Sequence, residues 1–211
     1  MVISGGDAGH LARSLRAKPG QEITVLDPEG FSMKVRLDVV GPERAAGTVI
    51  SQRPYQPEPA ARVTLAVANL PAPALDVVLS RCTEAGAFAF VVFQADRSVG
   101  RASRIDRWTS ICREASMLAE RFHVPEVSIA SSFEAALEAT DNPIVLQREE
   151  RRLLKDITEP RDVTLFVGPE GGWTDRELGL VETFASLGPR NFRADTAALV
   201  GLAIALSGRG G

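Results

Sequence analysis

Hydrophobic and polar residues alternate along the segment from Glu22 to Arg53. The alternation is interrupted at Asp27–Gly30 and at Gly41–Glu43, where Gly, Pro and acidic residues favour turns. A period of two places successive side chains on opposite faces of a strand. The pattern therefore predicts a small antiparallel β unit near the start of the chain.

The segment Arg53–Ala60 holds three prolines in eight residues. Proline stiffens an extended backbone and removes the amide donors that a sheet would need. We therefore place a domain boundary here, and we expect one domain over residues 1–57 and a second over residues 58–211.

Beyond this boundary, short apolar stretches alternate with segments of helical periodicity. The expected strands are 63–68, 88–94, 127–130, 144–146, 164–167 and 191–192, and the expected helices are 75–85, 103–122, 133–139, 174–187 and 196–206. Such alternation is typical of an α/β fold with a mostly parallel sheet. Trp108 and Cys112 lie on the apolar stripe of the longest expected helix, so we expect both in the core.

The composition adds to this picture chiefly by exclusion. The chain has 211 residues, of which 45% are hydrophobic and 24% charged, which is typical of a globular protein. Its apolar stretches fall short of the roughly 20 residues that a bilayer span needs, and the N-terminus lacks a basic segment followed by an apolar one. With only two cysteines, we expect a reduced, cytoplasmic protein without a membrane partner.

The formal net charge is −3, and only three of the 24 basic residues are lysines. The other basic residues are arginines, whose planar guanidinium suits phosphate groups and base edges. A local basic patch can bind phosphate on a mildly acidic protein, so the charge leaves a nucleic-acid partner open.

Several common chemistries lack their residues. The chain holds two histidines and no cysteine pair at metal-ligand spacing, so we expect no metal site. The Gly-x-Ser-x-Gly elbow, the Walker-type loop and the Rossmann fingerprint are also missing. Hydrolysis by a serine nucleophile and the usual modes of nucleotide binding are therefore not expected.

The segment Gly168–Gly172, with the sequence Gly-Pro-Glu-Gly-Gly, follows an apolar strand pattern. Thr174 and Glu177 then have the Thr-x-x-Glu spacing of a capping box that begins a helix. Ligands of open α/β sheets bind at the carboxyl ends of strands, and paired glycines let a flat ligand approach the main chain. We expect a ligand loop here.

A second loop, Leu187–Ala197, lies about 20 residues further on. Asp195 is a candidate N-cap of the final helix, and Arg193 is expected at the end of a short strand beside the first loop. We therefore expect the two loops to face one crevice.

Five blocks together resemble the RsmE-type 16S rRNA (uracil-N3) methyltransferases, a family of the knotted SPOUT class. The blocks, in order, are His10–Arg16 with Gly20, Arg81–Gly86, Arg97-Ser98, Gly168–Gly172 with Glu177, and Leu187-Gly188 through Arg193–Ala197.

The resemblance implies a PUA-like small β-barrel for RNA binding over residues 1–57 and a SPOUT α/β domain with a trefoil knot over 58–211. Only nine residues precede His10, where the family usually has more, which leaves open that the first barrel strand is missing. The resemblance also implies a homodimer that binds S-adenosylmethionine (S-adenosyl-L-methionine) in its knot loops. The implied cofactor-binding residues are Gln147, Gly168, Pro169, Glu170, Gly171, Gly172, Leu187, Gly188, Asn191 and Phe192.

The reaction implied by the resemblance is methyl transfer to N3 of a uridine in 16S rRNA within the 30S subunit. N3 carries a weakly acidic proton, so a cation or a base must assist its loss. Arg193 is the candidate cation, and Asp195 or Glu170 is the candidate proton acceptor. The candidate RNA contacts are Arg13, Arg16 and Arg97.

Two alternatives stay open. A knotted methyltransferase could act on another RNA site, such as a tRNA ribose 2′-hydroxyl. A non-catalytic RNA-binding or ribosome-assembly factor could retain the same fold, and Met117-Leu118, which replace the family's usual Glu-Gln pair, favour this second alternative.

Overall fold

The computed structural model describes residues 1–27, 29–99, 104–157 and 162–207. The chain divides into two compact units, Met1–Pro57 and Glu58–Gly211. Residues 208–211, and residue 103 of one expected helix, lie outside the described residues.

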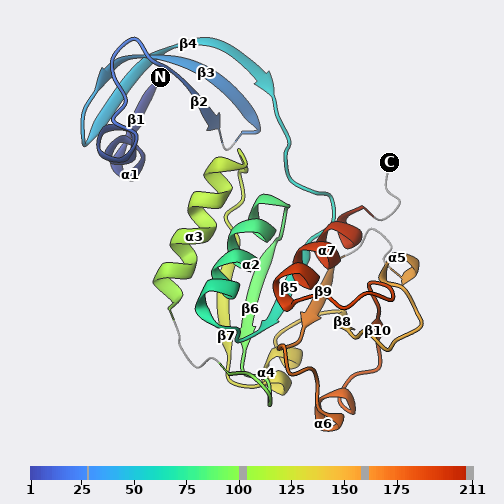
Figure 1. Cartoon of the computed structure of the whole chain (residues 1–211). Helices are drawn as coiled ribbons and strands as arrows, with labels where there is room; N and C mark the ends of the chain where they lie inside the picture. The colour runs from blue at the N-terminus through green and yellow to red at the C-terminus, as the bar shows by residue number, and fades with distance from the viewer. Residues whose placement is uncertain (28, 100–103, 158–161, 208–211) are drawn as a thin grey trace. The chain divides into compact units, whose positions relative to one another are not determined.

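The first unit is built on one antiparallel sheet. Its strands are β1 (Val2–Ser4), β2 (Glu22–Asp27), β3 (Phe31–Val40) and β4 (Arg44–Pro54), in the order β1-β4-β3-β2. The register between β3 and β4 shifts twice, after Lys34 and after Leu37. Such bulges bend and twist strands, and Figure 1 shows this sheet strongly curled. The expected antiparallel β unit is confirmed.

A helical turn lies between β1 and β2 and was not foreseen from the sequence. It consists of α1 (Gly5–Gly9) and a single π-helical turn, His10–Ser14. Leu11 packs with Leu37 and Ala45 in the small core of this unit. The five-residue α1 contains three glycines, so local propensity alone could not have predicted it.

The second unit contains a six-stranded sheet in which every pair of neighbouring strands is parallel. Its strands are β5 (Val63–Ala68), β6 (Ala89–Phe93), β7 (Glu126–Ala130), β8 (Pro143–Leu146), β9 (Val163–Val167) and β10 (Phe184–Ala185), in the order β10-β8-β9-β5-β6-β7. The α/β class with a mostly parallel sheet is confirmed. The expected trefoil knot stays a prediction.

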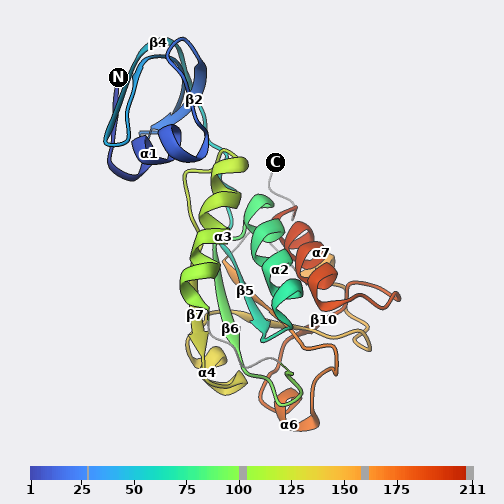
Figure 2. The same cartoon turned by 60° about the vertical axis from the view of Figure 1, so that its left-hand side comes forward.

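Helices cover both faces of this sheet (Figures 1 and 2). Side chains alternate along each strand, so β5 sends Leu65 to one core and Ala66 to the other. The first core lies beneath α2 (Ala72–Glu84), α3 (Ile105–Leu118), α5 (Leu154–Ile157) and α7 (Ala194–Leu206), and the second beneath α4 (Phe133–Glu138) and α6 (Asp175–Leu178). Trp108 and Cys112 are buried in the first core, as predicted.

The expected helix over 174–187 is confirmed only at its start, and the expected strand over 191–192 is wrong. The helix α6 ends at Leu178, and the chain then turns back so that Phe184 and Ala185 pair with β8. This pairing buries Ala185 completely and packs Phe184 against the second core. Tertiary pairing and burial therefore outweigh the helical pattern of the sequence. Among the described residues, no helix has the length and apolar character needed to cross a membrane.

Candidate functional site

A cavity of about 670 Å³ lies at the carboxyl ends of β8 and β9 and is closed by the chain that follows β10. Its described lining residues are Leu146, Gln147, Arg148, Glu149, Val167, Gly168, Pro169, Glu170, Gly172, Trp173, Leu178, Leu187, Gly188, Arg190, Asn191, Phe192, Arg193, Ala194 and Ala197. The two sequence-predicted loops therefore meet at one cavity, together with the segment after β8.

This cavity brings together most of the sequence-predicted site residues. Among the proposed cofactor ligands, Gly171 alone is absent from the described lining residues. Arg193 and Glu170 line the cavity, whereas the described lining does not include Asp195.

The first cavity loop begins at Gly168, which lies against the indole of Trp173. A Cβ atom at position 168 would stand 2.8 Å from Cε2 of this ring. The indole Nε1 donates to the carbonyl of Leu146 at 3.0 Å, and the ring stacks on Phe93. Gly168 therefore allows a fixed indole to join the ends of β8 and β9.

Pro169 and Gly172 form a tight turn within this loop. The amide of Gly172 donates to the Pro169 carbonyl at 2.9 Å, and Gly172 has φ +71°, a conformation that favours glycine. A Cβ at Gly172 would meet nothing within 4 Å. The main chain of this turn is thus open to a flat ligand.

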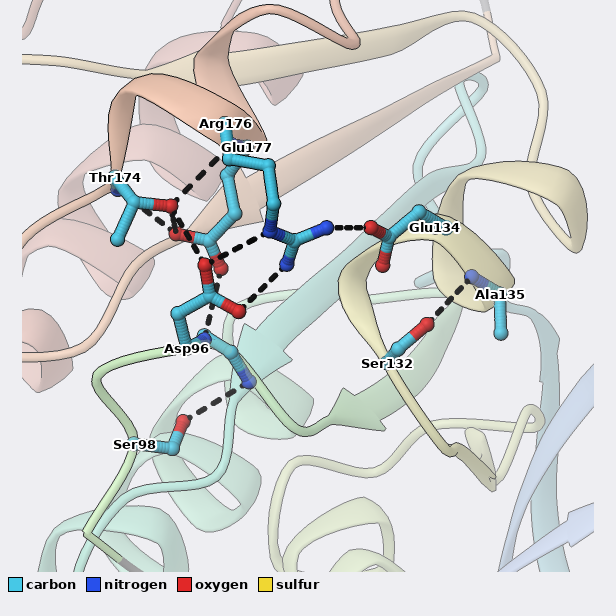
Figure 3. Close-up of polar contacts among 9 residues, drawn as sticks. Asp96, Ser98, Ser132, Glu134, Ala135, Thr174, Arg176 and Glu177 are labelled. Atoms are coloured by element: carbon cyan, nitrogen blue, oxygen red, sulfur yellow. Dashed lines mark hydrogen bonds and ion pairs between the residues drawn. The ribbon is translucent and has the colours of Figure 1, made fainter.

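The turn is followed by the predicted capping box, which is confirmed. Thr174 is the N-cap of α6, its hydroxyl accepts from the Glu177 amide, and the Glu177 side chain accepts from the Thr174 amide. Glu177 is fully buried, and its Oε1 also accepts from the amide of Asp96 at 3.0 Å. Figure 3 shows these groups together. The capping box therefore joins α6 to the loop that follows β6.

The second cavity loop is held by the buried Ser186. Its amide donates to the Arg152 carbonyl at 2.8 Å, and its hydroxyl bonds the main chain of Gly188. Gly188 has φ +107°, a backbone conformation that favours glycine. A Cβ added at this position would meet nothing within 4 Å, so the main chain here has open space beside it.

Asp195 does not cap α7, which corrects one expectation. The N-cap is Arg193, and Asp195 lies in the first turn, where its carboxylate accepts from the amide and hydroxyl of Thr196. The helix therefore begins two residues earlier than the sequence predicts, because the cavity loop runs directly into it. An acidic residue in the first turn still favours the helix dipole.

Charges of both signs line the cavity. Arg148, Arg190 and Arg193 are exposed cations, and Glu149 and Glu170 are exposed carboxylates. Sequence reasoning missed the roles of Arg148, Arg190 and Trp173 as lining residues. Arg148 and Arg190 are adjacent in sequence to predicted site residues, so that adjacency could have suggested them. Trp173 is a large apolar residue, and its type suggests a place in the core instead.

The described lining does not include the predicted RNA-binding arginines. Arg13 and Arg16 are exposed in and just after the π-helical turn of the first unit, and Arg16 has φ +49°. Arg97 follows β6 and donates to the carbonyls of Gly171 and Trp173 at 2.9 and 3.2 Å.

The arrangement suits a mid-sized polar cofactor. Its volume is within the range of small-molecule sites, roughly 300–1,000 Å³, and main-chain groups lie beside both glycines. S-adenosylmethionine carries an adenine, a carboxylate and two positive charges, and the cavity offers uncovered backbone, arginines and carboxylates for them. Within the described part of the chain, no group of three His, Cys, Asp or Glu side chains could hold a metal ion.

Comparisons with known proteins point to one group. Residues 56–206 match a family model described as an RNA methyltransferase domain. The ribosomal RNA small subunit methyltransferase E of Synechocystis is 32% identical over 214 residues, covering 92% of this chain and 68% of that protein. The Bacillus subtilis protein of the same name is 28% identical over 222 residues, covering 95% of this chain and 87% of that protein.

A solved structure supports the same similarity. The ribosomal RNA small subunit methyltransferase E of Neisseria gonorrhoeae, bound to S-adenosyl methionine, has a TM-score of 0.82 and 28% identity. The match covers 96% of this chain and 89% of that one, so it extends over both units.

Proposed function

Because the chain belongs to the RNA methyltransferase family that includes ribosomal RNA small subunit methyltransferase E, we propose that it methylates N3 of a uridine in 16S rRNA within the 30S subunit. It is an S-adenosylmethionine-dependent rRNA methyltransferase. The observation that carries the proposal is the single cavity formed by the loops after β8, β9 and β10 in a chain of this family. The ribosomal substrate places the reaction in the cytoplasm.

The cofactor is held by the loop Gly168–Gly172 and by the loop from Leu187 to Phe192, with Gln147 on a third wall. Pro169, Glu170, Gly188 and Asn191 belong to these loops and line the same cavity. When bound, S-adenosylmethionine supplies an electrophilic methyl group. Main-chain groups beside the glycines distinguish adenine, and the carboxylates favour the positively charged sulfonium.

Arg193 is the catalytic cation of the proposal. It is exposed and lines the cavity, and its guanidinium stabilises the negative charge that uracil gains as N3 loses its proton. Glu170 lines the same cavity and is the first candidate acceptor for that proton. Asp195 is the second candidate, because its carboxylate already accepts two hydrogen bonds from Thr196.

Contacts to the RNA backbone involve the first unit. Arg13 and Arg16 are exposed and have the charge to bind phosphate, which positions RNA without reading its sequence. Homodimer formation and recognition of the assembled 30S subunit complete the proposal.

The test is methyl transfer from labelled S-adenosylmethionine to 30S subunits that lack the modification, followed by nucleoside mass analysis. We expect 3-methyluridine in 16S rRNA. Methylation of tRNA ribose instead would replace this substrate with the alternative one. Cofactor binding without any transfer, on either RNA, would contradict the uridine proposal, and absence of cofactor binding would favour a non-catalytic assembly factor.

The variant Arg193→Ala tests the catalytic assignment. Loss of the cation should lower kcat by about 100-fold or more, since a donor aimed at a developing negative charge contributes on that scale. Cofactor affinity, measured by calorimetry, should change little. Arg190→Ala is the matched control, because Arg190 lines the same cavity and its guanidinium lies over the Phe192 ring. Turnover at the wild-type level in Arg193→Ala would refute the assignment.

A further inference from the structure

Arg97 forms hydrogen bonds with the main chain of the first cavity loop. One nitrogen, Nη1, donates to the Gly171 carbonyl at 2.9 Å and to the Trp173 carbonyl at 3.2 Å. A Cβ atom at Gly171 would stand 3.1 Å from Cβ of Arg97, so the two segments are in close contact at this glycine. Hydrogen bonds from a charged donor are stronger than neutral ones. Arg97 therefore constrains the chain on both sides of Gly172.

Asp96, the preceding residue, is attached to the same region. Its carboxylate accepts from the Thr174 hydroxyl at 2.8 Å and from Arg176 Nη2 at 2.5 Å (Figure 3). Its amide donates to the buried carboxylate of Glu177. The segment after β6 thus bonds the cavity loop, the N-cap of α6 and the first turn of α6.

The ion pairs of this network extend to α4. Arg176 also bonds Glu134, in the first turn of α4, so one guanidinium joins two acidic residues from different elements. Hydrogen bonds from Arg176 and then Thr174 hold the pKa of Asp96 below its usual value. The network is therefore charged at neutral pH.

We propose that Asp96 and Arg97 are positioning residues for the cofactor, and that Arg97 acts through the Gly171 and Trp173 carbonyls rather than by binding RNA phosphate. The described lining of the cavity does not include Arg97, whereas the loop that it holds faces that cavity. The inference rests on the proposed function, because it takes S-adenosylmethionine as the ligand of this loop.

The experiment compares Arg97→Ala and Arg97→Lys with the wild type and with Arg107→Ala. Arg107 is a suitable control because, like Arg97, it is an exposed arginine of the second unit, and its guanidinium pairs with Asp76 rather than with the cavity loop. For each protein, calorimetry measures S-adenosylmethionine affinity without RNA. Thermal unfolding reports stability, and steady-state kinetics on 30S subunits report KM for RNA and its salt dependence.

We expect Arg97→Ala to weaken cofactor binding by about tenfold or more, since two charge-assisted hydrogen bonds to the loop are lost. KM for RNA and its salt dependence should stay within about twofold of wild type, because no phosphate contact is removed. Arg97→Lys should recover only part of the affinity, because an ammonium is a point charge and lacks the reach and planar geometry of the guanidinium. Arg107→Ala should bind the cofactor as the wild type does.

Asp96→Asn keeps the size and the backbone amide of Asp96, removes its charge and replaces one of its two acceptor oxygens with an amide donor. We expect a smaller loss of cofactor affinity from this variant than from Arg97→Ala, with the melting temperature near that of wild type. This second variant keeps the proposal testable if Arg97→Ala does not fold.

Two results overturn the inference alone. One is wild-type cofactor affinity in Arg97→Ala and Asp96→Asn, or in Asp96→Asn alone if Arg97→Ala does not fold. The other is an unchanged affinity with a raised KM for RNA that Arg97→Lys restores fully, which would make Arg97 a phosphate ligand. If the wild-type protein itself binds no S-adenosylmethionine, the proposed function fails and the inference fails with it.

Discussion

Gly168 illustrates how one residue at the end of β9 determines the shape of the cavity. Any side chain at this position would meet the Trp173 indole, and this indole is held by its bond to Leu146 and by its contacts with Phe93 and Phe133. The indole cannot retreat without breaking these contacts. Glycine is therefore needed here for close packing, since the cavity loop starts where the indole and the strand touch.

The variant Gly168→Ala should lower the free energy of unfolding by about 1–3 kcal/mol, the range for overpacking a tight site. Cofactor affinity should fall as well, because the displaced indole lines the cavity. Urea unfolding and calorimetry measure the two effects. In a Trp173→Phe background the smaller ring leaves room, so the cost of Gly168→Ala should shrink. Equal costs in both backgrounds would show that the clash with Trp173 is not the cause.

At the scale of elements, α6 depends on its capping box more than on its length. The helix spans only Asp175–Leu178, and so short a helix has little stability of its own. Its first turn is held by Thr174 and Glu177, and both residues also bond Asp96. The cap therefore serves as a junction between two loops as well as the start of a helix.

Thr174→Ala should destabilise the protein by about 1–2 kcal/mol, because it removes the N-cap acceptor together with the bond to Asp96. Thr174→Ser retains the hydroxyl and should recover most of that free energy. Chemical unfolding of the two variants provides the comparison. A serine variant as unstable as the alanine variant would mean that the methyl group of Thr174, and not its hydroxyl, stabilises this junction.

At the scale of the second unit as a whole, Glu58 and Arg121 join distant parts of the chain. The Arg121 side chain is 4% exposed, bonds Glu58 at 2.5 Å and donates to the carbonyls of Thr83 and Ala87. The other Glu58 oxygen accepts from the amides of Phe122 and His123. One ion pair thus connects the start of the unit with the ends of α2 and α3.

This pair predicts a pH dependence. Burial raises the pKa of Glu58. Hydrogen bonds from Arg121 and from the His123 amide, together with the Arg121 charge, lower this pKa by more than burial raises it, so it lies below the usual 4.5. A pKa lowered by folding favours the ionised, folded form. The contribution of Glu58 to stability is therefore complete above about pH 4.5 and is lost as the pH falls through the lower pKa of the folded state.

Glu58→Gln should lower stability at pH 7 by about 1–3 kcal/mol and should flatten the decline of stability below pH 4.5. Urea unfolding from pH 7 to pH 3 measures both effects. Glu182→Gln, at an exposed position, is the control and should follow the wild-type curve. An unchanged slope in Glu58→Gln would assign the acid sensitivity to other carboxylates.

Local signals determined a large part of this protein. Alternation of period two identified β2 to β4, and the alternation of strand and helix patterns identified the parallel sheet. The Thr174–Glu177 spacing identified the start of α6, and the two glycine-containing loops identified the walls of the cavity. Each of these features depends on residues within a few positions of one another, so the sequence is sufficient to indicate it.

Only the tertiary structure decided the remaining features. Phe184 and Ala185 became a strand because β8 offers an open edge, and Asp195 lies inside α7 because the cavity loop ends at Arg193. Arg97 is attached to the Gly171 and Trp173 carbonyls, 74 and 76 positions further along the chain. Strand pairing, burial and long-range hydrogen bonds depend on which segments meet in space, and that information is spread over the whole chain.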